Sequence, residues 1–438
     1  MSTVSRPNVV IILTDDQGYG DLSCMGATDF YTPHLDRLAE SGVRFTSWYA
    51  ASPVCSPSRA GLLTGRYPAH AGVRSILGGR RTTQGLSPEI PTLSSELRRL
   101  GYHTAFYGKW HLGLSPECRP ERHGFETWMG FMAGCIDYYS HIYYWGQSGG
   151  LNPVHDLWQD GVEFYANGQY FTEMVTDHAV RYIRQAAQEA TPFFLYVAYN
   201  APHYPMHAPK TYLDRFAQLS WDRQIMAAML SAVDDGVGAM ADELARQGIL
   251  ENTLIFFQSD NGPSRESRNW LDGRDDPYYG GTAGQLKGHK FSLYEGGIRV
   301  PGIMSWPARI PSDQVIDTPA MAVDIFPTIL SAVGGDAGAY AVDGYDMLPM
   351  VTSGAASPRP PIFWEMGEQI AMRDGAWKLV LHGQLEEGAP VEDTVHLSNL
   401  DDDMGERHNL SSANPELTEA FVDQATRWRA NIEVGGAK

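Results

Sequence analysis

Short apolar runs alternate with longer amphipathic segments along most of the chain. Continuous apolar runs rich in β-branched and aromatic residues are typical of strands buried on both faces, and they occur at 9–14, 104–107, 193–199 and 253–258. Apolar residues spaced three or four apart indicate helices, which we expect at 33–41, 92–100, 177–189 and 222–246. The alternation predicts an α/β fold with a large, mainly parallel sheet flanked by helices.

The pattern changes twice further along the chain. Residues 130–168 are rich in Tyr, Trp, Gly and His without a period, so we expect long loops that either wall a pocket or form a tyrosine-rich surface. Residues 281–301 are also loop-like, and a helix is expected at 324–333. After Gly354 come strand-like runs at 362–364 and 377–381 and a closing helix at 415–430. These features predict a main α/β domain over 1–355 and a small α+β C-terminal subdomain over 356–438, packed on it.

Composition excludes several classes of protein. The chain has 438 residues and a net charge of −19, from 33 basic and 52 acidic residues, which argues against nucleic acid as a partner. A local basic cluster can still bind a small anion. Four scattered cysteines are too few for a disulfide framework. The first apolar run is too short for a signal peptide and no stretch is long enough to span a membrane, so we expect a soluble cytoplasmic protein without a membrane partner.

Polar residues follow each of the four expected central strands. In open parallel sheets, ligands bind beyond the carboxyl ends of the strands. Each residue alone has an ordinary explanation as a turn or surface residue, but all four strand ends carry titratable or amide groups. The acids and amide suit Ca²⁺ or Mg²⁺ better than zinc, and the basic groups suit a tetrahedral oxyanion. The residues are Asp15-Asp16, Lys109 with His111, His203, and Asp260-Asn261.

A further helix is expected after Cys55. Ser56 is the expected N-cap, Pro57 a first-turn proline, and Gly65 the stop. Cys55 then lies at the N-terminus of the helix, where unpaired N–H groups and the helix dipole favour negative charge. Arg59 follows about one turn later and can approach the same point. The pattern predicts an anion site made of a sulfur atom, an arginine and a helix N-terminus.

Three interpretations of Cys55 compete. It is a small buried core residue, a low-pKa thiolate nucleophile, or part of a family signature. The phosphate-binding loop of cysteine phosphatases is excluded, because it needs Arg six residues after Cys, where this chain has Gly61. The run Cys-x-Pro-x-Arg followed by Ala-x-x-Leu-Thr-Gly-Arg resembles the signature of the sulfatases. In that family the cysteine is oxidised to formylglycine after translation.

Further blocks carry the same resemblance, from residue 8 to about residue 410. These motifs are highly specific, and they follow one another in the same order as in the family. The blocks are 8–16, 20–22, 32–39, 107–113, 201–205, 259–263, 287–301, 395–400 and 406–410. The resemblance implies an alkaline-phosphatase-like fold, with residues 1–355 as the catalytic domain, and a sulfuric ester hydrolase of the arylsulfatase type.

The resemblance also implies roles for the site residues. The hydrate of formylglycine at Cys55 would be the nucleophile, and Arg59 would hold it and the metal site together. Asp15, Asp16, Asp260 and Asn261 would bind one divalent cation, usually Ca²⁺ rather than Mg²⁺ or Mn²⁺. Lys109, His203 and Lys290 would bind the sulfate oxygens, and one of them would protonate the leaving alcohol. His111 would support the base that breaks down the enzyme–sulfate intermediate. A formylglycine-generating enzyme would be a partner during maturation.

Several alternatives stay open. The same motifs serve relatives that hydrolyse phosphonate monoesters or phosphodiesters, and a non-catalytic binding protein is a third hypothesis. The alcohol carrying the sulfate, aryl or sugar, is not fixed, and a homo-oligomer is compatible with the sequence. His289 replaces a glycine that the family often has, and either tunes the pocket or points outward, while Lys287 is expected to support the loop. The aromatic residues that either stack on the substrate or belong to the core are Tyr138, Tyr139, Tyr143, Tyr144 and Trp145.

Overall fold

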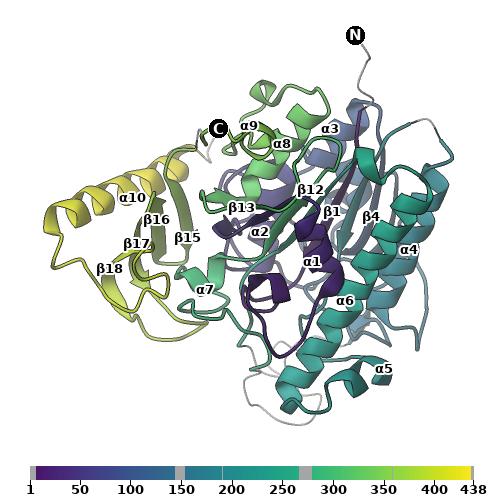
Figure 1. Ribbon diagram of the computed structural model, residues 1–438, viewed down its shortest axis with the longest axis horizontal. Coiled ribbons are helices and arrows are strands. Elements are labelled where there is room, and N and C mark those ends of the chain that lie inside the picture. The colour runs from purple at the N-terminus through teal and green to yellow at the C-terminus, as the bar shows by residue number, and fades with distance from the viewer. Residues whose placement is uncertain (1–5, 144–152, 190, 266–278, 358, 436–438) are drawn as a thin grey trace.

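The computed structural model of the protein describes residues 6–143, 153–189, 191–265, 279–357 and 359–435. Its larger part is a ten-stranded sheet with helices on both faces (Figure 1). The strands are, in spatial order, β13 (Gln314–Ile316), β2 (Val43–Phe45), β12 (Gly302–Ser305), β11 (Thr253–Ser259), β1 (Asn8–Thr14), β10 (Phe193–Ala198), β4 (His103–Lys109), β5 (Thr127–Phe131), β8 (Trp158–Gln159) and β9 (Val162–Glu163). The prediction of a large, mainly parallel sheet flanked by helices is confirmed.

The four strands predicted from apolar runs form the centre of this sheet. β11, β1, β10 and β4 are adjacent and mutually parallel. Nearly every residue in them is buried, because both faces of a central parallel strand are covered. Ile11 lies in register with Tyr196 on one side and with Phe256 on the other. Parallel pairing therefore brings the carboxyl ends of all four strands to one edge of the sheet.

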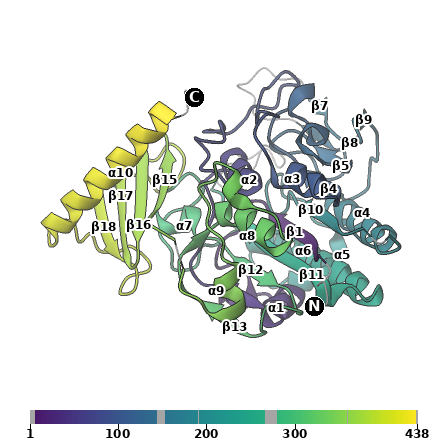
Figure 2. The ribbon, with the colours of Figure 1, turned by 90° about the horizontal axis from the view of Figure 1, so that it is seen from above.

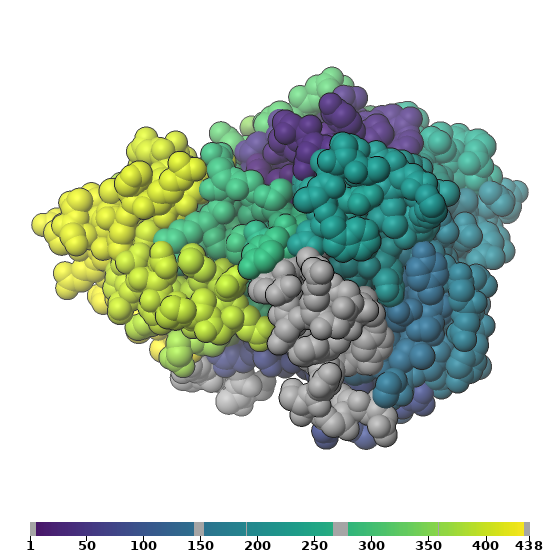
Figure 3. All heavy atoms as spheres, turned by 90° about the horizontal axis from the view of Figure 1, so that it is seen from below, coloured from purple at the N-terminus to yellow at the C-terminus, as the bar shows by residue number. Residues whose placement is uncertain are grey.

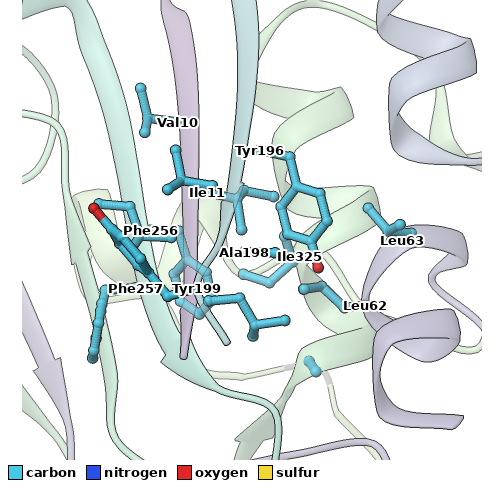
Figure 4. Packing of buried hydrophobic residues seen from close by; sticks show 14 of the residues in the cluster. Val10, Ile11, Leu62, Leu63, Tyr196, Ala198, Tyr199, Phe256, Phe257 and Ile325 are labelled. Carbon is cyan, nitrogen blue, oxygen red and sulfur yellow. The ribbon is translucent and has the colours of Figure 1, made fainter. Parts of the chain in front are cut away.

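Helices cover the two faces of the sheet in separate groups (Figure 2). One group contains α1 (Pro33–Glu40), α4 (Phe171–Ala186), α5 (Lys210–Leu213) and α6 (Trp221–Arg246). The other contains α2 (Cys55–Thr64), α3 (Leu93–Arg99), α8 (Ile325–Ala332) and α9 (Leu348–Ser353). On this second side Leu62, Leu63 and Ile325 pack toward Tyr196 and Ile11 of the sheet (Figure 4). This apolar contact fixes α2, and with it Cys55, against the central strands.

The expected N-cap of α2 was wrong. The helix begins at Cys55, its N-cap position is Val54, and no side chain caps it. Ser56 Oγ instead accepts a hydrogen bond from Leu77 N at 3.1 Å, because that loop lies against the first turn. The expected stop is confirmed, since Gly65 adopts the left-handed conformation with φ of 67°.

Smaller differences concern the ends of elements and the loops. α4 begins at Phe171, earlier than expected, because Phe171, Met174 and Val175 extend its buried face. The loop-like region before Pro301 contains one helical turn, α7 (Glu295–Ile298). In the 130–168 region, β6 (Ile142–Tyr143) pairs with β7 (Val154–His155), and β8 pairs with β9. Elsewhere, the short strand β3 (Trp48–Tyr49) pairs with β14 (Ala320–Met321).

The C-terminal part is a small antiparallel sheet covered by one helix. Its strands pair in sequence order: β15 (Ile362–Met366), β16 (Gln369–Asp374), β17 (Trp377–Gly383) and β18 (Asp393–Asn399). The helix α10 (Pro415–Gly435) packs on β15, β16 and β17 through a core of its own that includes Met372, Leu379, Leu397 and Ala425. This layer stands beside the main body in Figures 1 and 3. The boundary between residues 355 and 356 stays a prediction.

A buried cluster of charges joins this small sheet to the main domain. Lys378 Nζ lies 2.9 Å from Glu295 Oε1 and 3.1 Å from Glu406 Oε1, with all three side chains fully buried. Glu295 N also donates to Glu406 Oε2 at 2.6 Å, and Arg299 pairs with Glu295 at 3.1 Å. Burial, together with the charge of Glu295, raises the pKa of Glu406 to about 7. The cluster ties α7 to the C-terminal sheet, because breaking a buried pair leaves an uncompensated charge.

No helix in the described ranges combines the length and the apolar character needed to cross a membrane.

Candidate active site

The ten residues singled out from the sequence meet at one edge of the central sheet. They come from positions as far apart as 15 and 290, and none has more than 4% of its surface exposed. Asp16 N donates to Asp260 Oδ1 at 3.1 Å, and Asn261 Nδ2 donates to Asp16 Oδ1 at 2.7 Å, so the ends of β1 and β11 are directly joined. The set is Asp15, Asp16, Cys55, Arg59, Lys109, His111, His203, Asp260, Asn261 and Lys290.

Arg59 connects three of the elements that build the site. Its Nε and Nη2 donate to Asp260 Oδ2 at 3.0 and 2.7 Å, and Nη1 donates to Lys109 O at 2.9 Å. Nη2 also lies 3.6 Å from Asp15 Oδ1. The planar guanidinium, held on α2 one turn after Cys55, thus fixes the strand ends relative to the helix.

Cys55 is the first residue of α2, a helix of ten residues. Burial raises the pKa of its thiol, although Lys109 and Lys290 act in the opposite direction. The thiol therefore stays protonated near neutral pH and is a poor nucleophile as it stands. The raised pKa argues against the interpretation of Cys55 as a low-pKa thiolate nucleophile. The helix N-terminus still favours negative charge beside this position.

Two lysines bring positive charge to the carboxylates. Lys109 Nζ donates to Asp15 Oδ2 at 2.5 Å, and Lys290 Nζ donates to Asp16 Oδ2 at 3.0 Å. Burial alone would lower the pKa of Lys109, but Asp15 raises it. Burial would likewise raise the pKa of Asp16, but Lys290 and His203 lower it to about 2. Lys109 and Asp16 are therefore charged at neutral pH.

The hydrogen bonds of His203 define its tautomer. Nδ1 lies 2.7 Å from Tyr204 O, and since a carbonyl oxygen only accepts, Nδ1 carries the hydrogen. Nε2 lies 3.4 Å from Lys290 Nζ and 3.6 Å from Asp16 Oδ2. Tyr138, buried beneath the loop, reaches the carbonyl oxygens of Asn200 and His203 at 2.8 and 2.9 Å. His203 can thus hold or release a proton at Nε2.

His111 has the opposite arrangement. Its Nε2 lies 3.0 Å from Leu77 O and must donate to it, while Nδ1 is buried without a hydrogen-bond partner among the described residues. Burial, with Lys109 nearby, lowers the pKa of His111 well below its usual value. The ring is therefore neutral and offers one free lone pair at Nδ1.

Strained backbone marks three positions around the site. Asp16, His111 and Phe291 have φ of 64°, 52° and 74°, a left-handed conformation that is uncommon for residues other than glycine. Such residues concentrate at functional sites, because the surrounding structure must hold them in place. Phe291 N donates to Pro53 O at 3.0 Å and Lys290 N to Pro263 O at 3.0 Å. The strained loop thereby carries Lys290 to the N-terminus of α2.

The two glycines of α7 allow that loop to fold tightly. A Cβ at Gly296 would lie 2.0 Å from Gly288 O, and one at Gly297 would lie 2.1 Å from Ser292 O. Only glycine fits where backbone approaches backbone this closely. The Glu-Gly-Gly run is therefore explained by packing of the loop that presents Lys290.

The acidic residues fit a divalent cation. Ligand atoms of Asp15, Asp16, Cys55 and His203 lie within 4.8 Å of one another. Within the described part of the chain, Asp15 Oδ1 and Asn261 Oδ1 are buried without a hydrogen-bond partner, so two oxygen donors are available. Burial, and after it the charge of Asp15, raises the pKa of Asp260 to about 7, so a bound cation would favour the ionised form of this carboxyl group. Hard oxygen ligands of this kind suit Ca²⁺ or Mg²⁺.

A pocket of about 270 Å³ opens onto this cluster. Of the aromatic residues expected either to stack on the substrate or to belong to the core, Tyr143 lines the pocket, whereas Tyr138 is buried and Tyr139 lies outside it. Tyr144 and Trp145 fall outside the described residues. No motif in the sequence marks Glu387, Phe291 or Tyr204 as lining the pocket, yet all three do. The described lining residues are Cys55, Ile76, Leu77, Gly78, His111, Gly134, Cys135, Tyr143, His203, Tyr204, Lys290, Phe291 and Glu387.

The two residues left open in the Lys290 loop lie outside that lining. Lys287 Nζ is 3.6 Å from Glu392 Oε1 and 4.2 Å from the centroid of the Tyr294 ring, so it holds the loop from outside. Burial lowers the pKa of His289 to about 4, so that its ring is neutral. The register through this loop therefore places Lys290 in the site.

Comparisons with known proteins agree with this geometry. Residues 7–335 match the sequence profile of the family described as Sulfatase. The chain is 33% identical over 395 residues to N-acetylgalactosamine-6-sulfatase of Mus musculus, covering 85% of this chain and 71% of that one. It is 31% identical over 467 residues to arylsulfatase A of Homo sapiens, covering 96% and 87%. The crystal structure of Ps i-CgsB in complex with k-i-k-neocarrahexaose superposes with a TM-score of 0.85 at 31% identity, covering 97% of this chain and 93% of that chain.

Proposed function

Since this chain belongs to the sulfatase family and is a sulfuric ester hydrolase, we propose that it releases inorganic sulfate from a sulfated sugar through formylglycine at position 55 and one divalent cation. One observation carries the proposal. Three buried cationic side chains and three buried carboxylates meet around Cys55, at the floor of a pocket with aromatic walls. The cationic side chains are Arg59, Lys109 and Lys290, and the carboxylates are Asp15, Asp16 and Asp260.

Position 55 provides the nucleophile in this proposal. Formylglycine supplies, as its hydrate, a hydroxyl group that attacks sulfur and a second one that allows sulfate to be released. A formylglycine-generating enzyme is the partner that would make it from Cys55. The unmodified thiol does not serve, because burial raises its pKa.

Asp15, Asp16, Asp260 and Asn261 would hold the cation, which we expect to be Ca²⁺. Bound there, it supplies positive charge beside the reacting group. The three carboxylates and three cationic side chains of the cluster balance each other. A divalent cation would leave the site with net positive charge, which favours the anionic substrate and the charge that grows in the transition state.

The sulfate oxygens would contact Lys290, Lys109 and His203. All three side chains are buried, and Lys290 and His203 line the pocket, so their charges act where water is largely excluded. When His203 is protonated, its Nε2–H can donate to the leaving oxygen, because Nδ1 is already committed to Tyr204 O. Lys290, 3.4 Å from Nε2, can supply the same proton.

His111 would accept a proton in the step that frees sulfate. Its Nδ1 lone pair is free among the described residues, and its lowered pKa keeps the ring neutral. His111 and Cys55 line the same pocket. A neutral imidazole held by Leu77 O can take a proton without turning its ring.

A sugar is the alcohol that we favour. Relatives with sugar sulfates in their names are among the similar proteins, and Ps i-CgsB is described in complex with a neocarrahexaose. The walls of the pocket add aromatic faces, Tyr143, Tyr204 and Phe291, against which a ring can pack.

The test compares purified enzyme on 4-nitrophenyl sulfate, on a monosulfated hexose and on an aryl phosphonate monoester, with Cys55→Ala as the inactive control. We expect sulfate release from the first two and a higher kcat/KM for sulfate than for phosphonate. Because sulfate and phosphonate esters have similar shapes, both must be measured. A higher kcat/KM for the phosphonate would favour the alternative that the enzyme hydrolyses phosphonate monoesters or phosphodiesters. Turnover that Cys55→Ala retains would contradict the proposed nucleophile.

A further inference from the structure

One wall of the pocket comes from the small C-terminal sheet. Glu387 lines the pocket and lies in the loop between β17 and β18, almost 100 residues beyond Lys290. That loop is tied to the active-site loop, since His289 N donates to Leu385 O at 2.9 Å. The side chain of Gln369 bridges both, accepting from Gln384 N at 3.0 Å and donating to Phe291 O at 2.8 Å. These hydrogen bonds hold Gln384 and Leu385, at the start of the loop that carries Glu387, beside the Lys290 loop.

Glu387 gives the pocket a charge that the catalytic cluster does not explain. It is the one acidic residue among the described residues that line the pocket. Its carboxylate has no hydrogen-bond or ion-pair partner in the described ranges, and the residue is exposed, whereas Lys290 is 2% exposed. The pocket thus has a buried cationic floor and an unpaired acid nearer the solvent.

The walls between floor and rim suit one ring. Tyr143, Tyr204 and Phe291 are aromatic and Ile76 and Leu77 are aliphatic. The volume of about 270 Å³ lies just below the range for small-molecule sites, roughly 300–1,000 Å³. With the sulfate group on the cationic floor, the ring that bears it would occupy this space and reach the rim.

We propose that Glu387 selects the alcohol: it accepts hydrogen bonds from free hydroxyl groups of a single sugar ring and disfavours a second anionic group on that ring. This inference rests on the proposed function and names the substrate class more closely. A carboxylate offers only acceptors, so it matches hydroxyl donors, and hydrogen bonds to a charged group are the stronger kind. A second sulfate or a carboxylate on the ring would face like charge, which discriminates against such substrates.

The neighbouring residue provides a matched control. Glu386 is also exposed, lies in the same loop, and does not line the pocket. Glu387→Ala and Glu386→Ala remove the same charge from adjacent positions. Glu387→Gln keeps an acceptor and removes the charge, which separates hydrogen bonding from repulsion.

Kinetics with three probes test the selection. The probes are 4-nitrophenyl sulfate, galactose 6-sulfate and a disulfated galactose. We expect Glu387→Ala to lower the ratio of kcat/KM for galactose 6-sulfate over 4-nitrophenyl sulfate by about tenfold to a hundredfold. Glu386→Ala should keep the ratio of the wild type. Glu387→Gln should raise kcat/KM for the disulfated sugar relative to the monosulfated one.

Binding measured by calorimetry in a Cys55→Ala background separates this inference from the proposed function. Suppose that galactose 6-sulfate binds, that Glu387→Ala weakens this binding, and that the enzyme without the Cys55→Ala substitution does not hydrolyse the sugar. The proposed function then fails, and the selection by Glu387 holds. If Glu387→Ala leaves binding and the kinetic ratio unchanged, or if Glu386→Ala changes both as much, the inference is overturned. Absence of galactose 6-sulfate binding to the parent protein overturns it as well.

Discussion

Lys287 and Lys290 lie three residues apart in one loop, and we predict opposite consequences for their removal. Lys290 is buried, lines the pocket, and lies 3.0 Å from Asp16 and 3.4 Å from His203. Lys287 lies outside the described lining, and its ammonium group lies near Glu392 and the Tyr294 ring. Lys290→Ala should therefore impair catalysis, whereas Lys287→Ala should affect only the stability of the loop.

The magnitudes follow from the two environments. Losing one preorganised group that stabilises a transition-state oxyanion costs about 2.7–4 kcal/mol, or roughly a hundredfold to a thousandfold in rate. We expect at least that loss in kcat/KM for Lys290→Ala, mainly in kcat, because the charge on the transferring group grows in the transition state. The pair of Lys287 with Glu392 has side chains 18% and 44% exposed, so the ion pair contributes about 0–1 kcal/mol to stability. The cation–π contact adds about 0.5–1 kcal/mol.

The assay measures kcat and KM of both variants on 4-nitrophenyl sulfate, with thermal unfolding and metal content in parallel. Metal content is needed because Lys290 contacts Asp16, a proposed ligand. Lys290→Ala should keep its fold and its metal while losing kcat, and Lys287→Ala should lose a small amount of stability while keeping kcat. If Lys287→Ala lowers kcat more than Lys290→Ala, the register assigned to this loop is wrong.

Three further predictions concern the nucleophile, the metal and the junction. Peptide mass spectrometry of active enzyme should find formylglycine at position 55, and fully active enzyme with only the thiol would contradict this. Asp15→Ala should lose Ca²⁺ and activity together, as measured by elemental analysis, whereas full activity after thorough chelation would exclude the metal. For Glu406, burial raises the pKa from 4.5 to about 7, so its stabilising contribution is complete below pH 4.5 and is lost as the pH rises through 7. Relative to Glu406→Gln, the wild type should lose unfolding free energy between about pH 5 and pH 8; a difference that does not vary with pH would refute this.

Much of the fold and the site could be read from local sequence. The apolar runs at 9–14, 104–107, 193–199 and 253–258 match the four central strands, and only the run at 193–199 extends one residue beyond its strand, because a strand buried on both faces needs apolar residues at every position. Polar residues directly after those runs identified the cluster, since parallel strands end at one edge. The run from Cys55 to Arg66 carried the family resemblance, and the comparisons confirm the family.

Other features depended on contacts between residues distant in the chain. The sequence alone could not order β11, β1, β10 and β4 side by side, because pairing depends on packing across the whole sheet. Ser56 has the chemistry of an N-cap, yet its hydroxyl is used by Leu77 N, 21 residues away. Glu387 has no motif around it and enters the pocket only because the C-terminal sheet docks on the Lys290 loop. The local sequence pattern thus determined which residues are buried and which polar groups follow each strand, whereas tertiary packing decided which of these groups meet. The reason is that the apolar or polar character of each residue is visible in the sequence, but the contacts between residues distant in the chain are not.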